Sequence, residues 1–107
     1  MKRMPRALDP HTAYHLLDRF QIVDVREPEE WAEGVLPEAL RLPLSHLEAL
    51  APLRVARERP VLLYCRSGNR SREAAQTLAR LGHRQVWHLE GGLTAWRAAG
   101  LPCIPPS

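Results

Sequence analysis

The six residues at positions 60–65, Pro-Val-Leu-Leu-Tyr-Cys, constrain the fold of this 107-residue chain more than any other stretch. From Val61 onward the run lacks the polar and apolar alternation that marks a strand with one solvated face. A strand of this kind is buried on both faces, and such strands are typical of parallel sheets. We therefore expect residues 60–65 to form a strand of a parallel sheet, with Cys65 at its carboxyl end.

The rest of the chain alternates between short apolar runs and helical patterns. The apolar runs predict three further strands, at 21–25, 39–43 and 85–89. Apolar periodicity, caps and stop signals predict helices at 9–20, 27–34, 44–53, 71–82 and 92–100. Alternating strands and helices indicate an α/β fold with a parallel sheet and right-handed crossovers. Ligands of such sheets bind beyond the carboxyl ends of the strands, which is where Cys65 is expected.

Local signals predict several element boundaries. Asp9 is a good N-cap, and Pro10 suits the first position of the helix that follows. We expect Ser45 to cap the helix at 44–53 and Pro52 to end it. The Pro-rich tail, residues 101–107, is expected to be irregular.

Length and composition limit the classes of protein. A chain of 107 residues is expected to form one domain, 1–107, with a single core. Two cysteines are too few for a disulfide framework, and no Cys/His cluster has zinc-like spacing, so we expect reduced thiols and no metal site. The net charge of +3 is spread along the chain without a binding motif, which argues against a nucleic-acid partner.

No apolar run approaches the length of about 18 residues that a membrane span needs. The basic start, residues 1–10, is not followed by the apolar region of a secretory signal. We therefore expect a cytoplasmic protein without a membrane partner.

Cationic and turn-forming residues follow Cys65 and precede the strongest predicted helix: Arg66, Ser67, Gly68, Asn69, Arg70 and Ser71. Gly68 accepts a positive φ and Asn69 tolerates one, so the chain can curl and point successive N–H groups inward as an anion-binding nest. A helix N-terminus and nearby arginines lower the pKa of a thiol, and the thiolate is the reactive nucleophile. The alternative is a buried, inert cysteine beside solvated arginines.

The segment Tyr-Cys-Arg-Ser-Gly-Asn-Arg-Ser, residues 64–71, resembles the active-site loop of the rhodanese family of sulfurtransferases, with its pattern Cys-x-x-Gly-x-Arg-Ser. Residues 23–34 and 88–102 resemble the first and the C-terminal signatures of the family, in the same order. The resemblance spans roughly residues 6–102 and is to a stand-alone, single-domain member. It implies a rhodanese-like fold, with a central, mostly parallel five-stranded sheet flanked by helices on both faces.

The resemblance also implies a reaction. Cys65 would attack the outer sulfur of a donor such as thiosulfate, keep that sulfur as a persulfide, and pass it to a thiol or to cyanide, without any other cofactor. Arg66 and Arg70 would attract the small anionic donor, and the amides of 66–71 with the hydroxyls of Ser67 and Ser71 would hold its charge. Ser71 is equally well explained as a helix-start residue only.

Two other functions share this loop. The domain would serve as a persulfide carrier or redox-sensing module for a protein partner if it turned over small donors slowly. Related cysteine phosphatases and arsenate reductases use Cys-x5-Arg, whereas Cys65 and Arg70 are separated by four residues. The tighter ring suits one sulfur atom better than a phosphoryl group, so we do not expect phosphatase activity.

Residues outside the loop receive simpler interpretations. Asp24 and Arg26 also lie at the carboxyl end of a strand, and we interpret them as a buried acceptor that braces loops and a cation paired with a carboxylate. Cys103 is interpreted as incidental rather than as a resolving thiol, because the tail has no sequence feature that would fix its geometry. Residues 35–39, Val-Leu-Pro-Glu-Ala, stand where the family usually has His-Ile-x-Gly-Ala, so the turn there is expected to differ.

Overall fold

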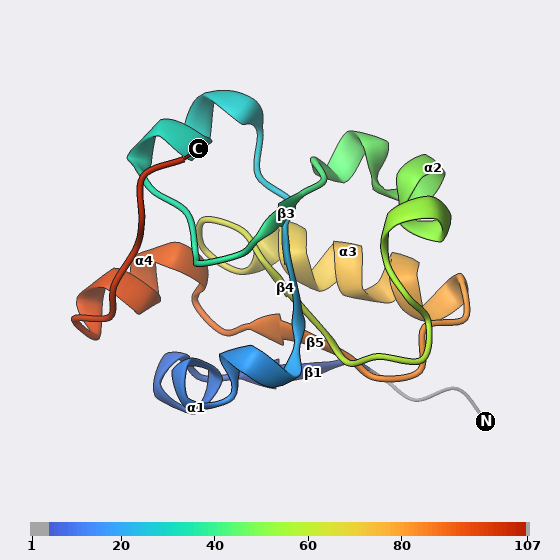
Figure 1. Cartoon of the computed structure of the whole chain (residues 1–107), viewed down its shortest axis with the longest axis horizontal. Helices are drawn as coiled ribbons and strands as arrows, with labels where there is room; N and C mark the ends of the chain where they lie inside the picture. Colours follow the sequence, from blue (N-terminus) through green and yellow to red (C-terminus); the bar gives the residue numbers. More distant parts are fainter. Residues whose placement is uncertain (1–4, 107) are drawn as a thin grey trace.

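In a computed structural model, which describes residues 5–106, the strands form one sheet in the order β1-β5-β4-β2-β3 (Figure 1). All four neighbouring pairs are parallel. The strands are β1 (Arg6–Leu8), β2 (Gln21–Asp24), β3 (Leu40–Arg41), β4 (Val61–Tyr64) and β5 (Val86–Leu89). As the apolar run predicts, β4 lies in the middle of the sheet and all four of its residues are buried.

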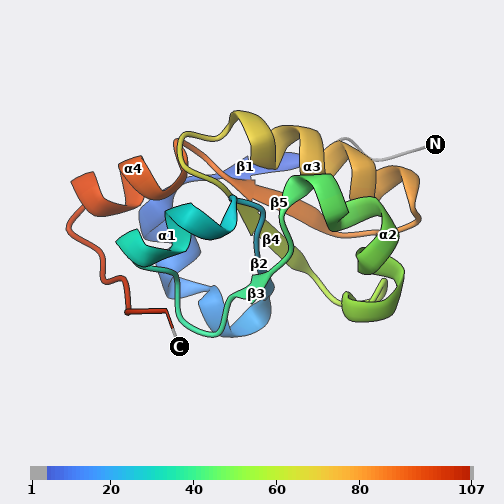
Figure 2. The ribbon, with the colours of Figure 1, turned by 90° about the horizontal axis from the view of Figure 1, so that it is seen from above.

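Helices cover both faces of this sheet (Figures 1 and 2). The helical elements are α1 (Pro10–His15), η1 (Leu17–Arg19), η2 (Pro28–Glu33), α2 (Leu44–Arg54), α3 (Asn69–Arg80) and α4 (Gly92–Ala98). Side chains of α2 and α3 form one core layer with alternate strand residues such as Val23 and Leu63. Side chains of α1 and α4 form the other layer with Leu62 and Tyr64. The α/β class and the five-stranded parallel sheet are therefore confirmed.

Several predicted elements differ in extent. The strand β1 is missing from the sequence prediction, because Arg6–Leu8 is a short, partly exposed edge segment whose strand conformation comes from pairing with β5. The helix predicted at 9–20 divides into α1 and the 3₁₀ turn η1, a common way for a helix to end. Asp9 caps α1 as expected, since its carboxylate accepts the N–H of Thr12 at 3.2 Å.

The predicted extent of α2, 44–53, is confirmed within one residue, but its predicted cap and stop residue are wrong. The helix begins at Leu44, directly after Pro43, and no side chain caps it; the Ser45 hydroxyl contacts the ring of its neighbour His46 instead. Pro52 lies inside the helix, which continues to Arg54. The exposed proline removes one N–H, and the buried Ala51 holds the last turn because its carbonyl accepts the N–H of Val55 at 2.9 Å.

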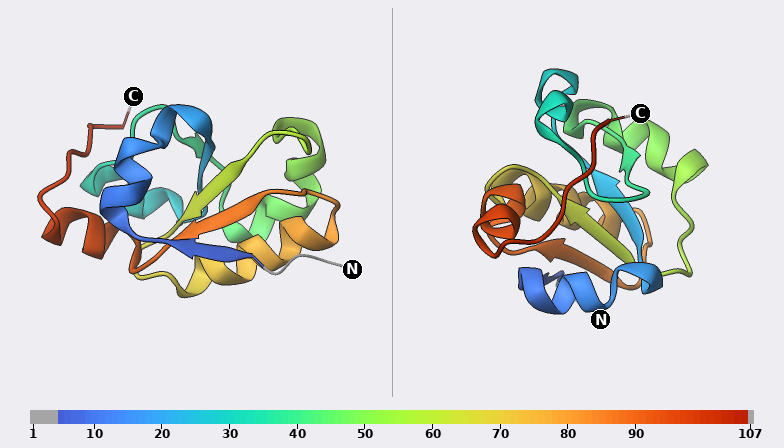
Figure 3. Two further views of the ribbon diagram at one scale, coloured as in Figure 1. Left: turned by 90° about the horizontal axis from the view of Figure 1, so that it is seen from below. Right: turned by 60° about the vertical axis from the view of Figure 1, so that its left-hand side comes forward.

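Residues 101–106 of the C-terminal tail form no helix or strand, as predicted, but hydrogen bonds anchor this segment. Figure 3 shows it returning from α4 toward η2. Val35 and Ile104 exchange two backbone hydrogen bonds of 2.9 Å in an antiparallel bridge, and the Trp96 indole donates to the Pro102 carbonyl at 2.9 Å. Cys103 is consequently fixed and half-buried against the layer formed by α1 and α4. The statement that nothing fixes the geometry of Cys103 is wrong.

The turn at residues 35–39 contains a strained residue, as its departure from the family pattern suggests. Glu38 has a φ of 58°, and the Ala39 N–H closes the turn on the Leu36 carbonyl at 3.3 Å. Within residues 5–106 it is the one non-glycine residue with a positive φ. A side chain in this conformation costs about 1–2 kcal/mol, which glycine avoids.

We therefore expect Glu38→Gly to stabilise the protein. The gain is about 0.5–1 kcal/mol, because the added flexibility of glycine in the unfolded chain offsets part of the relieved strain. Urea unfolding measures the difference. Glu48→Gly, at an exposed position inside α2, is the control and should destabilise by about 1 kcal/mol. Equal losses in both variants would show that the Glu38 turn carries no strain.

Candidate active site

The loop after Cys65 is held by the N-terminus of α4. The carbonyls of Cys65 and Arg66 accept the N–H groups of Leu93 and Thr94 at 2.9 and 3.0 Å. These donors belong to the first turn of a helix, where N–H groups have no partner within the helix. Since the C=O and N–H of a trans peptide point in opposite directions, fixing these two carbonyls turns the following N–H groups away from α4.

Hydrogen-bond donors of the loop converge on the sulfur of Cys65. Its Sγ accepts the backbone N–H of Gly68 at 3.1 Å and that of Ser71 at 3.3 Å. The thiol also contacts the Ser71 hydroxyl at 3.5 Å, and this hydroxyl donates to the Gly68 carbonyl at 3.2 Å. When the sulfur ionises, the same hydroxyl can turn and donate to it. The N–H groups of Gly68 and Ser71 therefore point inward at the sulfur, which is the backbone arrangement that the sequence predicts for this loop.

The left-handed turn of this loop is made by Gly68 alone, with a φ of 108°. Asn69 does not share it, because Asn69 is already the first residue of α3. The expectation that two adjacent residues curl the chain is therefore wrong. Asn69 is exposed, whereas Gly68 and Ser71 are buried beside the sulfur.

The surroundings of Cys65 favour its ionised form. Burial raises the pKa of the thiol, but hydrogen bonds from the Ser71 hydroxyl and from the N–H groups of Ser71, Gly68 and Ser67 outweigh it. The net result is a pKa below the ordinary value of a cysteine. Cys65 is only 1% exposed, so its sulfur lies below the rim of the loop and a reagent must enter the loop to reach it.

Two glycines allow α4 to approach the loop closely. A Cβ on Gly92 would lie 2.6 Å from the carbonyl oxygens of Cys65 and Arg66, and the φ of Gly92 is 61°. Gly91 before it has a φ of 73°, and a Cβ there would lie 2.5 Å from that of Ala95. The adjacent glycines at the start of α4 are the sequence feature that could have predicted this close approach. The sequence analysis did not predict it.

Gly92→Ala is expected to displace the Cys65 loop. We expect a loss of at least about 2 kcal/mol in unfolding free energy and a loss of the reactive thiolate, because the new methyl overlaps backbone atoms. Urea unfolding and the alkylation rate of Cys65 measure the two effects. Gly100→Ala is the matched control, since Gly100 has a φ of 76° but no atom within 4 Å of its added Cβ. Equal behaviour of the two variants would contradict the close contact.

The two arginines of the loop differ in their partners. Arg70 donates from both terminal nitrogens to the carboxylate of Glu30, at 2.6 and 2.8 Å. The exposed Arg66 side chain makes no hydrogen bond or ion pair with any residue from 5 to 106. Sequence reasoning missed Glu30, because its acidic neighbours Glu27 and Glu29 made it look like a first-turn helix charge.

A buried network braces the neighbouring loops, as interpreted from the sequence. The Asp24 carboxylate accepts the backbone N–H of Arg26 at 2.9 Å and pairs with its guanidinium at 2.8 Å. The guanidinium also donates to the carbonyls of Glu30 and Gly34, at 3.2 and 2.7 Å. Tyr64 donates its hydroxyl to Asp24 at 2.7 Å; burial and that carboxylate raise its pKa, so it stays a donor.

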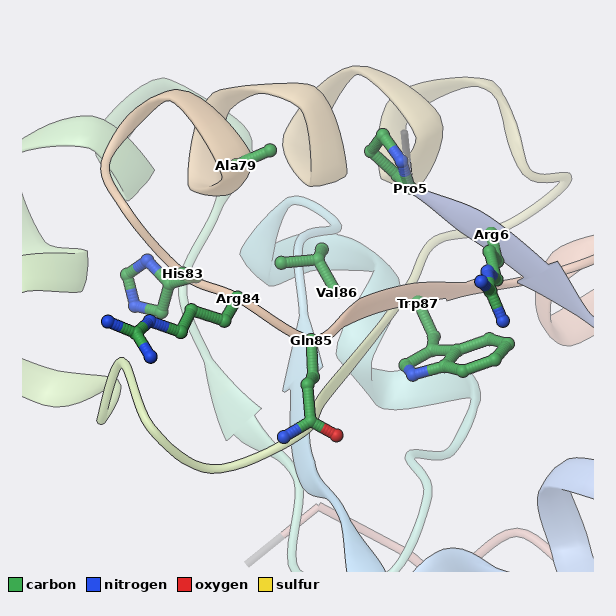
Figure 4. Close-up of a pocket in the computed structure, with 8 residues that line it drawn as sticks. All are labelled: Pro5, Arg6, Ala79, His83, Arg84, Gln85, Val86 and Trp87. Carbon is green, nitrogen blue, oxygen red and sulfur yellow. The ribbon is translucent and has the colours of Figure 1, made fainter. Parts of the chain in front are cut away.

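A hollow of about 50 Å³ lies at the opposite, amino-terminal edge of the sheet (Figure 4). Arg6 lies over the ring of Trp87 there, 5.4 Å from its centroid. Both ring nitrogens of His83 contact backbone carbonyls, so the histidine is used structurally. No group of three or more potential metal ligands exists among residues 5–106, and no helix in that range is long and apolar enough to cross a membrane.

Comparisons with known proteins agree with this geometry. A family model for the rhodanese-like domain matches residues 9–99. A sulfurtransferase of Allochromatium vinosum is 42% identical over 85 residues, which cover 79% of this chain and 78% of the relative. The thiosulfate sulfurtransferase GlpE of Coxiella burnetii is 34% identical, with 80% and 81% covered. The crystal structure of a rhodanese-related protein from Thermoplasma volcanium superposes with a TM-score of 0.81 at 27% identity, covering 92% of this chain and 97% of that one.

Proposed function

We propose that this chain, which belongs to the rhodanese-like domain family, acts as a sulfurtransferase. It moves a sulfane sulfur from thiosulfate or a similar donor to a thiophilic acceptor through a persulfide on Cys65. The observation that carries the proposal is the convergence of two backbone N–H groups and one hydroxyl on the Cys65 sulfur. A reduced, reactive thiol suits the reducing cytoplasm, where we propose that the protein acts.

The first half-reaction loads the sulfur. The Cys65 thiolate attacks the outer sulfur of thiosulfate, a new S–S bond forms, and the old S–S bond breaks with its electron pair leaving on sulfite. The persulfide ends in a sulfur that carries negative charge. The amides of Gly68 and Ser71 can donate to that charge, and such preorganised donors contribute about 2–4 kcal/mol each where charge develops.

The second half-reaction unloads the sulfur. A thiol acceptor, as thiolate, or cyanide attacks the terminal sulfur of the persulfide, and the electron pair of the broken S–S bond returns to Cys65 as its thiolate. The same donors that lowered the pKa of the thiol favour this leaving thiolate. No cofactor other than the persulfide takes part in the proposed cycle.

A steady-state assay with thiosulfate and cyanide tests the proposal, together with mass spectrometry of the protein after exposure to thiosulfate. We expect sustained thiocyanate formation and a gain of about 32 Da on Cys65. The name of the Coxiella relative supports thiosulfate as the first donor to use. Absence of both signals with every small donor and with organic persulfides would contradict the proposal.

The persulfide-carrier alternative remains, and the depth of the sulfur favours it. With Cys65 1% exposed, exchange with free small molecules is restricted to those that fit into the loop. A gain of about 32 Da with negligible steady-state turnover would favour a carrier that serves a protein acceptor. Phosphatase activity is not proposed, because Arg70 is held by Glu30 and the loop between Cys65 and Arg70 has four residues.

A further inference from the structure

The ion pair between Glu30 and Arg70, here called the rim pair, joins η2 to the first turn of α3. Its geometry is bidentate, with both terminal nitrogens of Arg70 on the carboxylate. The carboxylate is also held from its own side, because one of its oxygens accepts the N–H of Glu27 at 3.0 Å. The main chain at Glu30 is fixed as well, since its carbonyl accepts from Arg26.

The rim pair carries no net charge at any working pH. The hydrogen bonds from Arg70 lower the pKa of Glu30 to about 2, so the carboxylate stays ionised. The hydrogen bonds and the charge of Glu30 raise the pKa of Arg70, and the charge of the Cys65 thiolate adds to this effect. Arg70 directly precedes Ser71, whose N–H contacts the Cys65 sulfur at 3.3 Å. The site therefore meets a donor with a neutralised arginine, and the loop has one cation without a partner among residues 5–106, Arg66.

We propose that the rim pair selects sulfur donors by their charge. The ionised Glu30 cancels the positive charge of Arg70 and so lowers the affinity of the Cys65 site for dianions. Organic persulfides are therefore favoured over thiosulfate as donors. The inference rests on the proposed sulfurtransferase function. With a protonated persulfide, the Cys65 thiolate attacks the outer sulfur, the S–S bond breaks, and the electron pair leaves on the organic thiolate. This step places no second negative charge beside Glu30.

The competing explanation is that Arg70 binds the donor directly and Glu30 only positions it. A double-mutant cycle separates the two. Inorganic sulfate, an unreactive dianion, is the probe, and its protection of Cys65 from iodoacetamide at fixed ionic strength gives the apparent Kd. Glu30→Gln keeps the shape of the side chain and one contact to Arg70, while it removes the charge.

If the rim pair cancels its own charge, Glu30→Gln tightens sulfate binding about tenfold and Arg70→Ala weakens it about tenfold. The double variant then returns to within about threefold of the wild type, because both charges are gone. Glu29→Gln, which removes the same charge from an exposed neighbour in η2, is the control and should change the Kd by less than about twofold. The proposal would be overturned if the double variant bound sulfate as weakly as Arg70→Ala does, or if Glu30→Gln bound it more weakly than the wild type. It would also be overturned if sulfate protected Cys65 equally in all of these proteins or protected it in none of them.

Kinetics give the second readout. Glu30→Gln should raise kcat/KM for thiosulfate about tenfold and leave kcat/KM for the persulfide of 2-mercaptoethanol within about twofold. Equal changes for both donors would also overturn the inference. The double-mutant cycle with sulfate needs no catalytic turnover. If the protein transfers no sulfur but its variants show the expected changes in the apparent Kd for sulfate, only the proposed function is refuted. If the protein transfers sulfur but the apparent Kd for sulfate is the same in all variants of the cycle, the role of the rim pair is refuted and the proposed function is not.

Discussion

Cys65→Ser is expected to abolish sulfur transfer and to leave the protein folded. A serine hydroxyl stays protonated near neutral pH and cannot hold the transferred sulfur, so the rate should fall by at least about 1,000-fold. The hydroxyl can still accept the N–H groups of Gly68 and Ser71, so no buried donor loses its partner. Thiocyanate formation measures the first effect, and thermal unfolding followed by circular dichroism measures the second.

Cys103→Ser is the matched control for this substitution. Its thiol is held in the anchored tail and belongs to the layer of α1 and α4, away from the donors that converge on Cys65. We expect nearly unchanged transfer. Transfer that survives in Cys65→Ser and disappears in Cys103→Ser would show that the nucleophile is misassigned.

Asp24→Ala is expected to cause the largest loss of stability. Asp24 and Arg26 are both 0% exposed, so removal of the carboxylate leaves a guanidinium buried without its counter-charge. Breaking a buried pair in this way costs about 3–5 kcal/mol, a large part of the stability of a small domain. Tyr64 loses the acceptor of its hydroxyl as well. Urea unfolding at neutral pH measures the change in free energy.

Two further variants make the Asp24 result interpretable. Asp18→Ala removes an exposed carboxylate from η1 and should change the unfolding free energy by less than about 0.5 kcal/mol. Asp24→Leu combined with Arg26→Leu removes both buried charges and should be more stable than Asp24→Ala. A loss below about 1 kcal/mol in Asp24→Ala would contradict the bracing role of this network.

The sequence was sufficient for those elements whose stability is local or whose pattern is strong. The apolar run of β4 and the periodicity of α3 specify their own conformations, and both were predicted within two residues. The strand β1 was not, because nothing in Arg6–Leu8 requires a strand until β5 supplies its backbone partners. The anchored tail was missed for the same reason, since Val35 and Ile104 are distant in sequence.

The same distinction holds for the candidate site. Cys65, Gly68 and Ser71 are neighbours in sequence, so their shared hydrogen bonds follow from one tight turn before a helix. The partner of Arg70 was not predictable in this way, because Glu30 lies 40 residues earlier and meets Arg70 only in the folded chain. The donors from α4 that fix the loop carbonyls are likewise tertiary contacts, and only the adjacent glycines hint at them.

The most direct test is the pH dependence of Cys65 alkylation by iodoacetamide, measured in Cys103→Ser so that one thiol reports. The convergence of donors on the sulfur predicts a midpoint below about 8.5, the pKa of an ordinary cysteine. Ser71→Ala should raise that midpoint, because it removes the hydroxyl that contacts Sγ. Ser67→Ala should leave it unchanged, because the Ser67 side chain takes no part in the contacts of Sγ with Ser71 and Gly68. A midpoint at or above about 8.5, or a folded protein that resists alkylation throughout roughly pH 5 to 9, would contradict a reactive thiolate at Cys65.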